Sequence, residues 1–328
     1  MLIIDSPSQD AYFNIASEEY LLDCYPDEEI FLLYVNAPSV IVGRFQNTLA
    51  EINLDYVTKN GIKVVRRLSG GGAVYHDLGN LNFSFHTRLG TDDFSDFSRF
   101  TRPVVDLLNS LDVPARLEGR NDLLVDGKKF SGNAKLSRKG KMVQHGTILV
   151  NSQMAVLSEV LKVNPLKFRD KAVKSNRARV TNLIEYLPEG SNLKLFKAHL
   201  IDQMLQTGGD QVRIHLLTDA EIKGIEQLAA EKYSQWDWNF GVSPAYDFNK
   251  AIKLPAGFIE LHLDVQRGTI RKAKIFGDFF ASKPIEELEE RLYGVKHETE
   301  SIRQLLGQIP LRDYFGPVEA DELVDLFC

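Results

Sequence analysis

The sequence predicts an α+β fold divided into two domains. The chain has 328 residues, about two typical domain lengths, and its 44% hydrophobic and 26% charged residues are an ordinary globular composition. Strand patterns cluster and are flanked by helical patterns, whereas a doubly wound sheet would alternate strictly between the two. We therefore expect mixed sheets with flanking helices over residues 1–245 and a small α+β domain over residues 246–328.

The spacing of apolar residues predicts the first elements along the chain. Ile15, Tyr20 and Leu21 recur among acidic residues at helical spacing, whereas the apolar run from Phe31 to Val35 is typical of a buried strand. Gly61 marks the end of a second helix. We predict helices over 11–22 and 54–60, and strands over 31–35, 40–43 and 62–68.

An alternating pattern predicts a strand with two chemically different faces over residues 80–86. Leu81, Phe83 and Phe85 share one apolar face. The opposite face is polar and carries Asn80, Asn82, Ser84 and His86. Further strands are predicted over 123–125, 129–134 and 142–150, the first two joined by a turn at Asp126-Gly127.

The last third of the chain begins with a helix start signal. Thr218 and Glu221 have the spacing of a capping box, and we expect their helix to extend to about residue 235. Residues 243–255 show no clear period and are interpreted as a linker. We then predict strands over 258–265 and 269–276, and helices over 285–292, 299–306 and 318–327.

Several classes of protein do not fit the composition. Cys24 and Cys328 are too few cysteines for a disulfide framework, which favours a reducing compartment. The first residues lack the basic stretch and long apolar run of a secretion signal. No apolar stretch approaches the roughly 18 residues needed to span a bilayer. We expect a cytoplasmic protein with no membrane association.

The charge of the chain is unevenly distributed. Residues 115–180 carry 15 basic and 5 acidic side chains, although the whole chain has a net charge of −6. This polarity indicates attraction of an anionic partner such as a nucleotide or an acidic protein. Nucleic acid is not expected, because Phe130 and Phe168 are the segment's only aromatic residues and base stacking requires more.

A glycine triplet is the sharpest local feature of the sequence. Gly70 to Gly72 allow positive backbone angles and leave amide groups uncovered, which suits either a flexible turn or an anion-binding loop. Arg66 and Arg67 precede the triplet and favour the anion, because guanidinium groups donate charge-assisted hydrogen bonds. No P-loop lysine follows, and a dinucleotide fingerprint would require glycine where Tyr75 stands.

Three further motifs follow: Gly119-Arg120-Asn121-Asp122, Lys129-Phe130-Ser131-Gly132 and His145-Gly146-Thr147. Each one taken alone has an ordinary structural explanation, such as a turn cap, a surface charge or a core histidine. Their order and spacing carry the information.

Together these motifs resemble those of lipoate–protein ligases. The resemblance covers essentially the whole chain and rests on residues 66–85, 119–122, 129–132, 145–147, 179–183 and the tryptophan-rich run 236–241. It implies a biotin/lipoate ligase-like catalytic domain over 1–245 and an accessory domain over 246–328 that moves during the cycle. It also implies a two-step reaction, in which lipoate and ATP form lipoyl-AMP and pyrophosphate before the lipoyl group passes to a lysine of an acceptor domain.

The resemblance implies roles for individual residues. Lys129 is the catalytic residue, bound to carboxyl and phosphate oxygens. ATP and lipoyl-AMP are bound by Arg67, Gly70, Gly71, Gly72, Ala73, Val74, Tyr75, Asn121, Asp122 and Lys129. The lipoate pocket is formed by Leu68, Asn82, Ser84, Gly132 and His145. Asp122 meets either Mg²⁺ or the adenosine side, and His145 either positions the acyl or phosphate group or braces the sheet.

The implied acceptors are apo lipoyl domains of 2-oxoacid dehydrogenases or the glycine-cleavage H protein. The sequence leaves open which of these acceptors is used. It also leaves open whether octanoate is a substrate. An octanoyl or lipoyl acyltransferase would need a cysteine thioester. Positions 25–327 contain no cysteine, and Cys24 lies outside every motif. A non-catalytic lipoate-binding protein is the second alternative, with the same pocket and no turnover.

Overall fold

The structure is a computed structural model and describes residues 1–44, 46, 48–88, 96–119, 121–138, 140–161, 180–241, 246–254, 257–277, 283–316 and 318–327. The chain forms two compact units, one of Met1–Gln46 with Ala50–Gln235, the other of Asn47–Leu49 with Trp236–Cys328. The tryptophan-rich run, which we expected before the domain boundary, therefore groups with the second unit. Within these described ranges, no helix has both the length and the apolar character required to cross a membrane.

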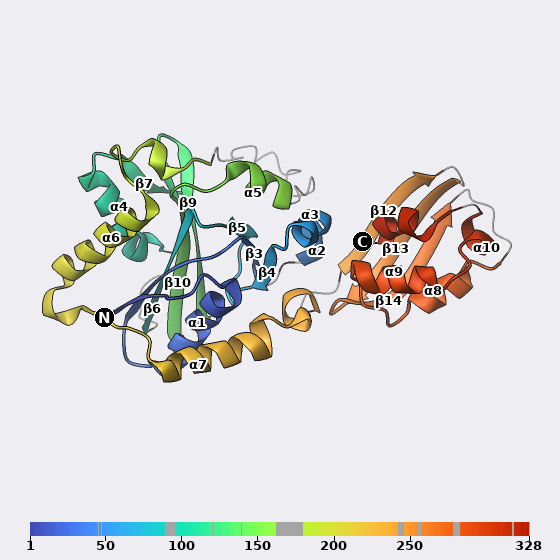
Figure 1. Ribbon diagram of the computed structural model, residues 1–328, viewed down its shortest axis with the longest axis horizontal. Coiled ribbons are helices and arrows are strands. Elements are labelled where there is room, and N and C mark those ends of the chain that lie inside the picture. The colour runs from blue at the N-terminus through green and yellow to red at the C-terminus, as the bar shows by residue number, and fades with distance from the viewer. Residues whose placement is uncertain are drawn as a thin grey trace. The chain divides into compact units, whose positions relative to one another are not determined.

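An eight-stranded mixed sheet occupies the centre of the first unit (Figure 1). Its spatial order is β11-β1-β2-β6-β10-β9-β8-β7. β1 pairs in parallel with β2 and β11, and the remaining neighbours are antiparallel. The strands are β1 (Leu2–Asp5), β2 (Ile30–Val35), β6 (Asn80–Arg88), β7 (Ala115–Glu118), β8 (Asp122–Val125), β9 (Lys128–Arg138), β10 (Lys141–Leu149) and β11 (Arg213–Ile214).

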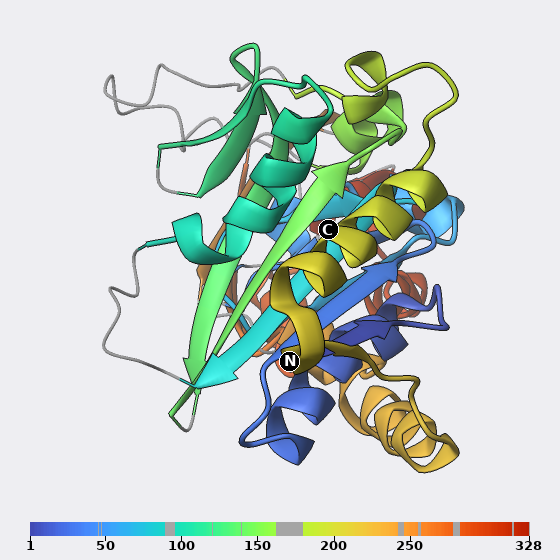
Figure 2. The same cartoon turned by 90° about the vertical axis from the view of Figure 1, so that its left-hand side faces the viewer.

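A second, smaller sheet has the order β4-β3-β5, with β3 (Ser39–Val42), β4 (Lys63–Arg66) and β5 (Val74–His76). Helices α4 (Ser98–Ser110) and α6 (Leu193–Gly208) cover one face of the large sheet (Figure 2). Helix α1 (Ala11–Cys24) contacts strands of both sheets. The other helices are α2 (Thr48–Glu51), α3 (Leu54–Lys59), α5 (Met154–Val160) and α7 (Asp219–Leu228), with short turns η3 (Leu183–Glu185), η4 (Gly209–Gln211) and η5 (Ala229–Tyr233).

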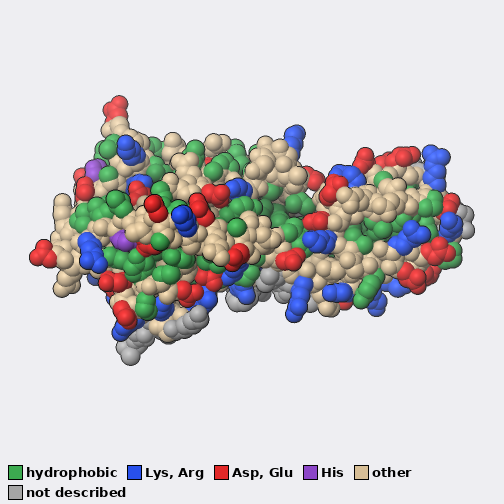
Figure 3. Space-filling model, turned by 60° about the horizontal axis from the view of Figure 1, so that its bottom comes forward, with side chains coloured by type: hydrophobic (Ala, Val, Ile, Leu, Met, Phe, Trp, Pro, Cys, Tyr) green, Lys and Arg blue, Asp and Glu red, His purple; other side chains and the backbone are tan. Residues whose placement is uncertain are grey.

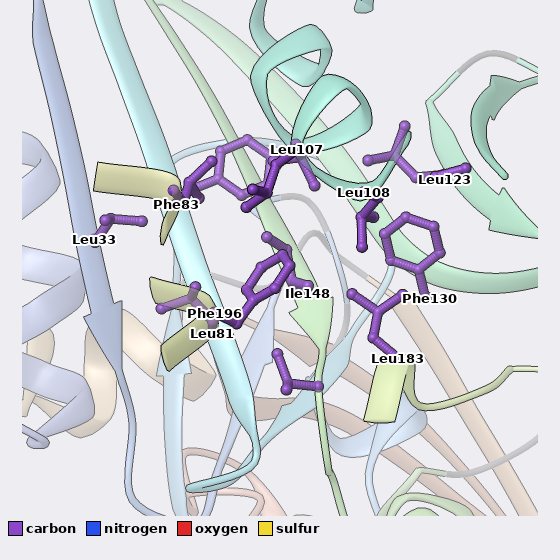
Figure 4. Packing of buried hydrophobic residues seen from close by; sticks show 14 of the residues in the cluster. Leu33, Leu81, Phe83, Leu107, Leu108, Leu123, Phe130, Ile148, Leu183 and Phe196 are labelled. Atoms are coloured by element: carbon purple, nitrogen blue, oxygen red, sulfur yellow. The ribbon is translucent and has the colours of Figure 1, made fainter. Parts of the chain in front are cut away.

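The predicted alternation in β6 is confirmed. Leu81, Phe83 and Phe85 lie in the buried apolar cluster to which α4 and α6 also contribute. Figure 4 shows Leu81 and Phe83 within this cluster. Phe85 stacks on Phe31 of β2, with ring centroids 4.4 Å apart. Burial of each such side chain contributes about 1.5–3 kcal/mol, so this cluster holds the sheet against its helices. The polar face of β6 is therefore turned toward the other side of the sheet, where the small sheet lies.

The second unit contains a three-stranded antiparallel sheet, β12 (Tyr246–Leu254), β13 (Gly257–Gln266) and β14 (Thr269–Gly277). The two predicted strands are confirmed as β13 and β14, but the linker expected over 243–255 is wrong for residues 246–254, which form β12. Phe248, Ile252 and Leu254 pack on the core with strand spacing, and Lys250 interrupts this pattern in the sequence. The unit also contains η6 (Asp237–Gly241), α8 (Glu286–Leu292), α9 (Thr299–Gly307), α10 (Arg312–Phe315) and α11 (Ala320–Phe327).

Most other sequence-based elements are also confirmed. The capping box of Thr218 and Glu221 is present, and α7 continues beyond Leu228 as the π-helical turn η5. Helix α4 was not predicted, because Pro103 in its interior is unfavourable for a helix. Asp126 and Gly127 both have positive φ, as the predicted hairpin turn requires.

Charged side chains of both signs are interspersed over the face shown in Figure 3. The basic segment over 115–180 is described only in part, because residues 162–179, including Phe168 and Arg179, lie outside the described residues. Its described part forms β7 to β10 and α5. The predicted attraction of an anionic partner to this segment stays a prediction.

Candidate active site

A cavity of about 180 Å³ lies between the two sheets of the first unit. One wall comes from the small sheet and the loop between β4 and β5, including Arg67, Ala73 and His76. The opposite wall comes from the large sheet and includes Asn82 and Lys129. Residues from separate parts of the sequence, including Asn121, Gly132 and His145, are brought together here as the motifs predicted.

The glycine loop is held in shape by the buried side chain of Arg67. The Arg67 Nη2 group donates to the carbonyls of Gly70 and Gly72, at 2.7 and 2.8 Å. Its Nη1 group donates to the carbonyl of Ile41 at 3.1 Å, and Nε donates to Ser69 Oγ at 3.0 Å. Gly71 between them has a φ of +93°, which favours glycine. Gly71, Gly72, Ala73 and Val74 then line the cavity.

The two arginines differ from the simple anion-binding fork that the sequence indicates. Arg66 donates to the carbonyls of Gly43, Arg44 and Gln46, and does not line the cavity. Burial lowers the pKa of both guanidinium groups to about 10, so both remain protonated at neutral pH. Both side chains brace loop backbone, and of the two only Arg67 also borders the cavity.

The register between neighbouring strands determines which side chains of the large sheet form its wall of the cavity. β10 pairs with β6 so that His145 lies opposite Ser84 and Thr147 lies opposite Asn82. These four residues therefore share the polar face of the sheet. On β9, Ala134 pairs with His145 and continues the same wall. The polar residues at alternate positions over 80–86 thus mark the face of the large sheet that is turned toward the cavity.

A β-bulge directs Lys129 toward the cavity. Leu123 pairs with Ser131 and Leu124 pairs with Lys129, so Phe130 is an extra residue in β9. Strict alternation from Ala134 and Gly132 would place Phe130 on the cavity face, but Phe130 is buried in the apolar core and Lys129 lines the cavity instead. Bulges commonly redirect a side chain in this way.

Lys129 has a partner and little room beside Gly132. Its Nζ lies 2.7 Å from Asp122 Oδ1, and about a third of each side chain is exposed. A Cβ on Gly132 would lie 2.9 Å from this Nζ. The ammonium is thus placed by Asp122 and by the missing side chain at Gly132, while it remains accessible from the cavity.

A hydrogen-bonded chain of Glu18, His145 and Ser69 crosses the cavity wall. His145 Nδ1 lies 2.7 Å from Glu18 Oε2, and Nε2 lies 2.6 Å from Ser69 Oγ. Burial alone would raise the pKa of the Glu18 carboxyl, but His145, His86 and the Tyr34 hydroxyl lower it below its ordinary value. The ionised carboxylate accepts from Nδ1–H, which orients the imidazole.

These three hydrogen-bonded residues are of the same types as a hydrolytic triad, but they are not arranged as one. Ser69 is 1% exposed and does not line the cavity. Its oxygen also accepts a hydrogen bond from Arg67, which holds this oxygen against the loop. The chain therefore connects His145 to the Arg67 loop rather than presenting a nucleophile.

Some residues predicted for the site do not line the cavity. Gly70 contributes a carbonyl to Arg67, and Tyr75 is buried in β5, where burial together with Asp77 and Tyr56 raises its pKa to about 12. Ser84 is fully buried on the polar face, where its Oγ lies 3.0 Å from His86 Nε2. Leu68 is partly buried. Asp122 is present only through its ion pair with Lys129. Arg120 and Arg179 lie outside the described residues.

Sequence reasoning missed several residues of the cavity. Glu18 and Asn36 carry no local motif, and the fold places them behind the cavity wall, where Glu18 contacts His145 and Asn36 contacts His76. His76 and Asn133 stand within the quoted stretches or beside them and line the cavity. His76 Nε2 and Asn133 Oδ1 are buried without a hydrogen-bond partner among the described residues. The signal that could have found Asn133 was its place directly after the motif Lys129-Phe130-Ser131-Gly132.

The cysteine and metal roles that the sequence raised concern Cys24 and the carboxylates of the described part of the chain. Cys24 is exposed at the end of α1 and does not line the cavity, and Cys328 lies outside the described residues. No group of three or more His, Cys, Asp or Glu side chains that could hold a metal ion occurs in those ranges. A metal ion at Asp122 would therefore need further ligands from its substrate.

Comparison with known proteins shows the family of the chain. Residues 10–205 match the lipoyl protein ligase A/B catalytic domain, and residues 243–327 match the bacterial lipoate protein ligase C-terminus. The chain is 44% identical to lipoate-protein ligase LplJ of Bacillus subtilis, over 99% of both chains. It is also 44% identical to lipoate–protein ligase 1 of Staphylococcus aureus, over 97% of this chain and 96% of that one.

Solved structures agree with this assignment. The bipartite lipoate protein ligase of Thermoplasma acidophilum is 34% identical, with a TM-score of 0.63 over 75% of this chain and 98% of that one. A lipoate-protein ligase A bound with ATP is 32% identical, with a TM-score of 0.60 over 74% and 98%. These structures confirm the expected fold of mixed sheets and flanking helices. The chain therefore belongs to the lipoate–protein ligase family.

Proposed function

We propose that this chain joins lipoate to a protein lysine in two steps. A carboxylate oxygen of lipoate attacks the α-phosphorus of ATP, which forms lipoyl-AMP and expels pyrophosphate. The amine of an acceptor lysine then attacks the acyl carbon, which forms an amide and expels AMP. The first step makes the second feasible, because a carboxylate is a poor electrophile and its mixed anhydride with AMP is a good one.

The observation that carries this proposal is the placement of Lys129. Its ammonium lines the cavity opposite the glycine loop, and its ion pair with Asp122 leaves about a third of the side chain exposed. Negative charge increases on the phosphoryl oxygens as the first step proceeds. A preplaced cation stabilises that charge without reorganisation of solvent. We assign Lys129 to the carboxyl and phosphate oxygens in both steps.

We assign the nucleotide to the glycine-loop wall and the acyl chain to the interior of the cavity. Amide groups of Gly72, Ala73 and Val74 suit phosphate oxygens, and Arg67 holds their loop in position. Asn82, Gly132 and His145 border the acyl side. The ATP-bound relative at 32% identity supports the nucleotide assignment, and a Thermoplasma acidophilum relative with bound lipoic acid, 30% identical, supports the acyl assignment.

Magnesium enters this proposal with the nucleotide. The carboxylate of Asp122 lies beside the ammonium group of Lys129. Mg²⁺ is commonly bound by one or two carboxylates together with substrate phosphates and water. Asp122 would hold such an ion, whose charge neutralises the leaving pyrophosphate. Asn121 donates to the carbonyl of Asn133 at 2.6 Å and so positions the segment that carries Asp122.

The acceptor that we propose is an apo lipoyl domain, with the glycine-cleavage H protein as the second candidate. A Thermoplasma acidophilum relative was solved in work on a ligase and its E2 lipoyl domain. Acidic acceptor surfaces would be attracted by the basic residues between 115 and 180.

The proposal is tested by incubating the full chain with ATP, Mg²⁺ and lipoate, and then with candidate acceptor domains. We expect lipoate-dependent pyrophosphate release and an acceptor mass increased by one lipoyl group. Octanoate in place of lipoate measures the acyl preference. A protein that only binds lipoate releases no pyrophosphate. An acyltransferase becomes covalently acylated, which increases the mass of the enzyme itself, or it delivers the acyl group without a nucleotide. Either of these results would overturn the proposal.

A further inference from the structure

His76 has an unusual position in the cavity wall. It lies at the end of β5, is 3% exposed and lines the cavity. Its Nδ1 lies 3.0 Å from Asn36 Nδ2, whereas its Nε2 has no hydrogen-bond partner among the described residues. Buried polar groups are rarely left unpaired, because each one loses its hydrogen bonds to water. The unpaired nitrogen therefore points to a partner that arrives with the ligand.

The state of His76 follows from a chain of hydrogen bonds that begins at backbone carbonyls. Asn14 Nδ2 donates to the carbonyls of Ser8 and Val35, at 2.9 and 3.3 Å. A carbonyl can only accept, so the atom of Asn14 at this position must be the amide nitrogen. The same nitrogen lies 2.8 Å from Asn36. An amide nitrogen cannot accept a hydrogen bond, so Asn36 must present its oxygen to Asn14, and the longer contact to Val35 shares one of the two hydrogens.

The orientation of Asn36 then decides the tautomer of His76. With its oxygen turned to Asn14, Asn36 presents its NH₂ group to His76 Nδ1. Nδ1 must accept this hydrogen bond, so the single proton of the neutral imidazole resides on Nε2. Asn14 and Asn36 are both fully buried, which removes water as a competing partner. Burial, together with Arg67 and His145, lowers the pKa of His76 to about 3, so the imidazole is neutral at working pH.

We propose that Asn14 and Asn36 are positioning residues that hold His76 as the Nε2–H tautomer, so that His76 donates a hydrogen bond to the ligand in this cavity. The acceptor is an oxygen or ring nitrogen of the acyl-adenylate or of its two precursors. The inference rests on the proposed function for the identity of this ligand. The tautomer itself depends only on the hydrogen-bond chain.

The test replaces Asn36 by aspartate, which has the same shape but no donor. The carboxylate of Asn36→Asp accepts from Asn14 on one side and from the imidazole on the other, so the proton of His76 moves to Nδ1. Nitrogen chemical shifts in ¹⁵N-histidine protein report this directly. His76→Gln identifies the signal among the seven histidines. We expect the Nε2–H tautomer in the unchanged protein and Nδ1–H in the variant at pH 8.5.

The activity of the variant should depend on pH in a characteristic way. At pH 8.5 the bare Nε2 cannot donate, and we expect kcat/KM for lipoate-dependent pyrophosphate release to fall about 10- to 100-fold, as when a designed hydrogen bond in a site is lost. At pH 6 the imidazolium carries a proton on Nε2 again, so the deficit should shrink. Arg67, Glu18 and His145 are the charged or titratable groups that face His76 from other elements, and they are the same in both proteins.

Ser6→Ala provides the matched control. Ser6 donates to Asn14 Oδ1 at 2.6 Å, at the far end of the same chain. This contact does not determine which atoms of Asn14 and Asn36 donate and which accept. We therefore expect His76 to keep the Nε2–H tautomer and kcat/KM to change at most twofold. Separate KM values for ATP and lipoate in Asn36→Asp show which precursor supplies the acceptor atom.

Two results would overturn the inference. One is an Nδ1–H or titrating His76 in the unchanged protein. The other is a folded Asn36→Asp protein with the shifted tautomer and unchanged kcat/KM at pH 8.5. If the unchanged protein shows no lipoate-dependent pyrophosphate release, the proposed function fails, and the nitrogen shifts still decide whether the hydrogen-bond chain acts as inferred.

Discussion

Arg67 and Lys129 border the same cavity from opposite sheets, and their charges are used differently. Arg67 is 6% exposed and donates four hydrogen bonds to the chain, two of them to loop carbonyls and one to the carbonyl of Ile41 in β3. Lys129 is paired with Asp122 and keeps 30% of its side chain exposed. The cation of one wall is thus bonded to the backbone around it, and the cation of the other wall is exposed to the cavity. Four predictions test this contrast.

Lys129→Ala is expected to have the largest effect. Removal of the ammonium should lower the rate of lipoate-dependent pyrophosphate release about 100- to 1000-fold, because the developing phosphoryl charge loses its preplaced partner. Lipoate binding by calorimetry and the thermal midpoint should change little. Lys128→Ala is the control, since Lys128 lies over the ring of Tyr186 and does not line the cavity. Near-normal turnover by Lys129→Ala would refute the assigned role.

Arg67→Met is expected to act mainly on stability. The carbonyls of Ile41, Gly70 and Gly72 lose their donor in a buried setting, so the free energy of unfolding should fall by about 2–4 kcal/mol. Urea denaturation measures the change. Arg116→Met removes an exposed ion pair with Glu118 and should change it by less than about 1 kcal/mol. Equal effects of the two substitutions would show that Arg67 does not hold the loop.

Two buried histidines, one in each sheet of the first unit, make stability depend on pH. Burial lowers the pKa of His76 on β5 to about 3 and that of His86 on β6 to about 4. Both are neutral in the folded chain and bind protons when it unfolds below pH 6.5, so the free energy of unfolding falls as pH falls from about 6.5 to 4. Each contributes a slope of up to about 1.4 kcal/mol per pH unit.

His86→Gln should flatten this slope when unfolding is measured by urea at several pH values. The exposed His199 on α6 serves for comparison, and His199→Gln should leave the slope as it is. If both variants show the original slope, His86 is not the group that takes up the proton.

A pair of glycine substitutions should give the smallest effect. Gly71 has a φ of +93°, and its Cβ would lie 3.0 Å from Arg67 Nη2, so Gly71→Ala should destabilise the fold by about 1–2 kcal/mol. Gly72 does not have a positive φ, and its Cβ would meet nothing within 4 Å. Gly72→Ala should change the thermal midpoint little. Indistinguishable midpoints would contradict the loop conformation.

Local patterns in the sequence predicted much of the fold. The alternation over 80–86 identified both faces of β6, and the capping box located the start of α7. The same patterns failed where one residue inside an element departs from the pattern of that element. Lys250 concealed the strand β12, and Pro103 concealed α4. The motif order also indicated most of the cavity wall, including Gly71 to Val74, Asn82, Asn121, Lys129, Gly132 and His145.

The amino-acid sequence by itself determined the α+β class, the glycine loop and the polar strand face, since each depends on neighbours within a few positions. Only the tertiary structure decided that Phe130 is an extra residue in β9, that Arg67 is directed to loop carbonyls, and that Asn14, Asn36 and His76 meet. Register and hydrogen-bond partners are set by which strands pack together, and no local pattern encodes that choice.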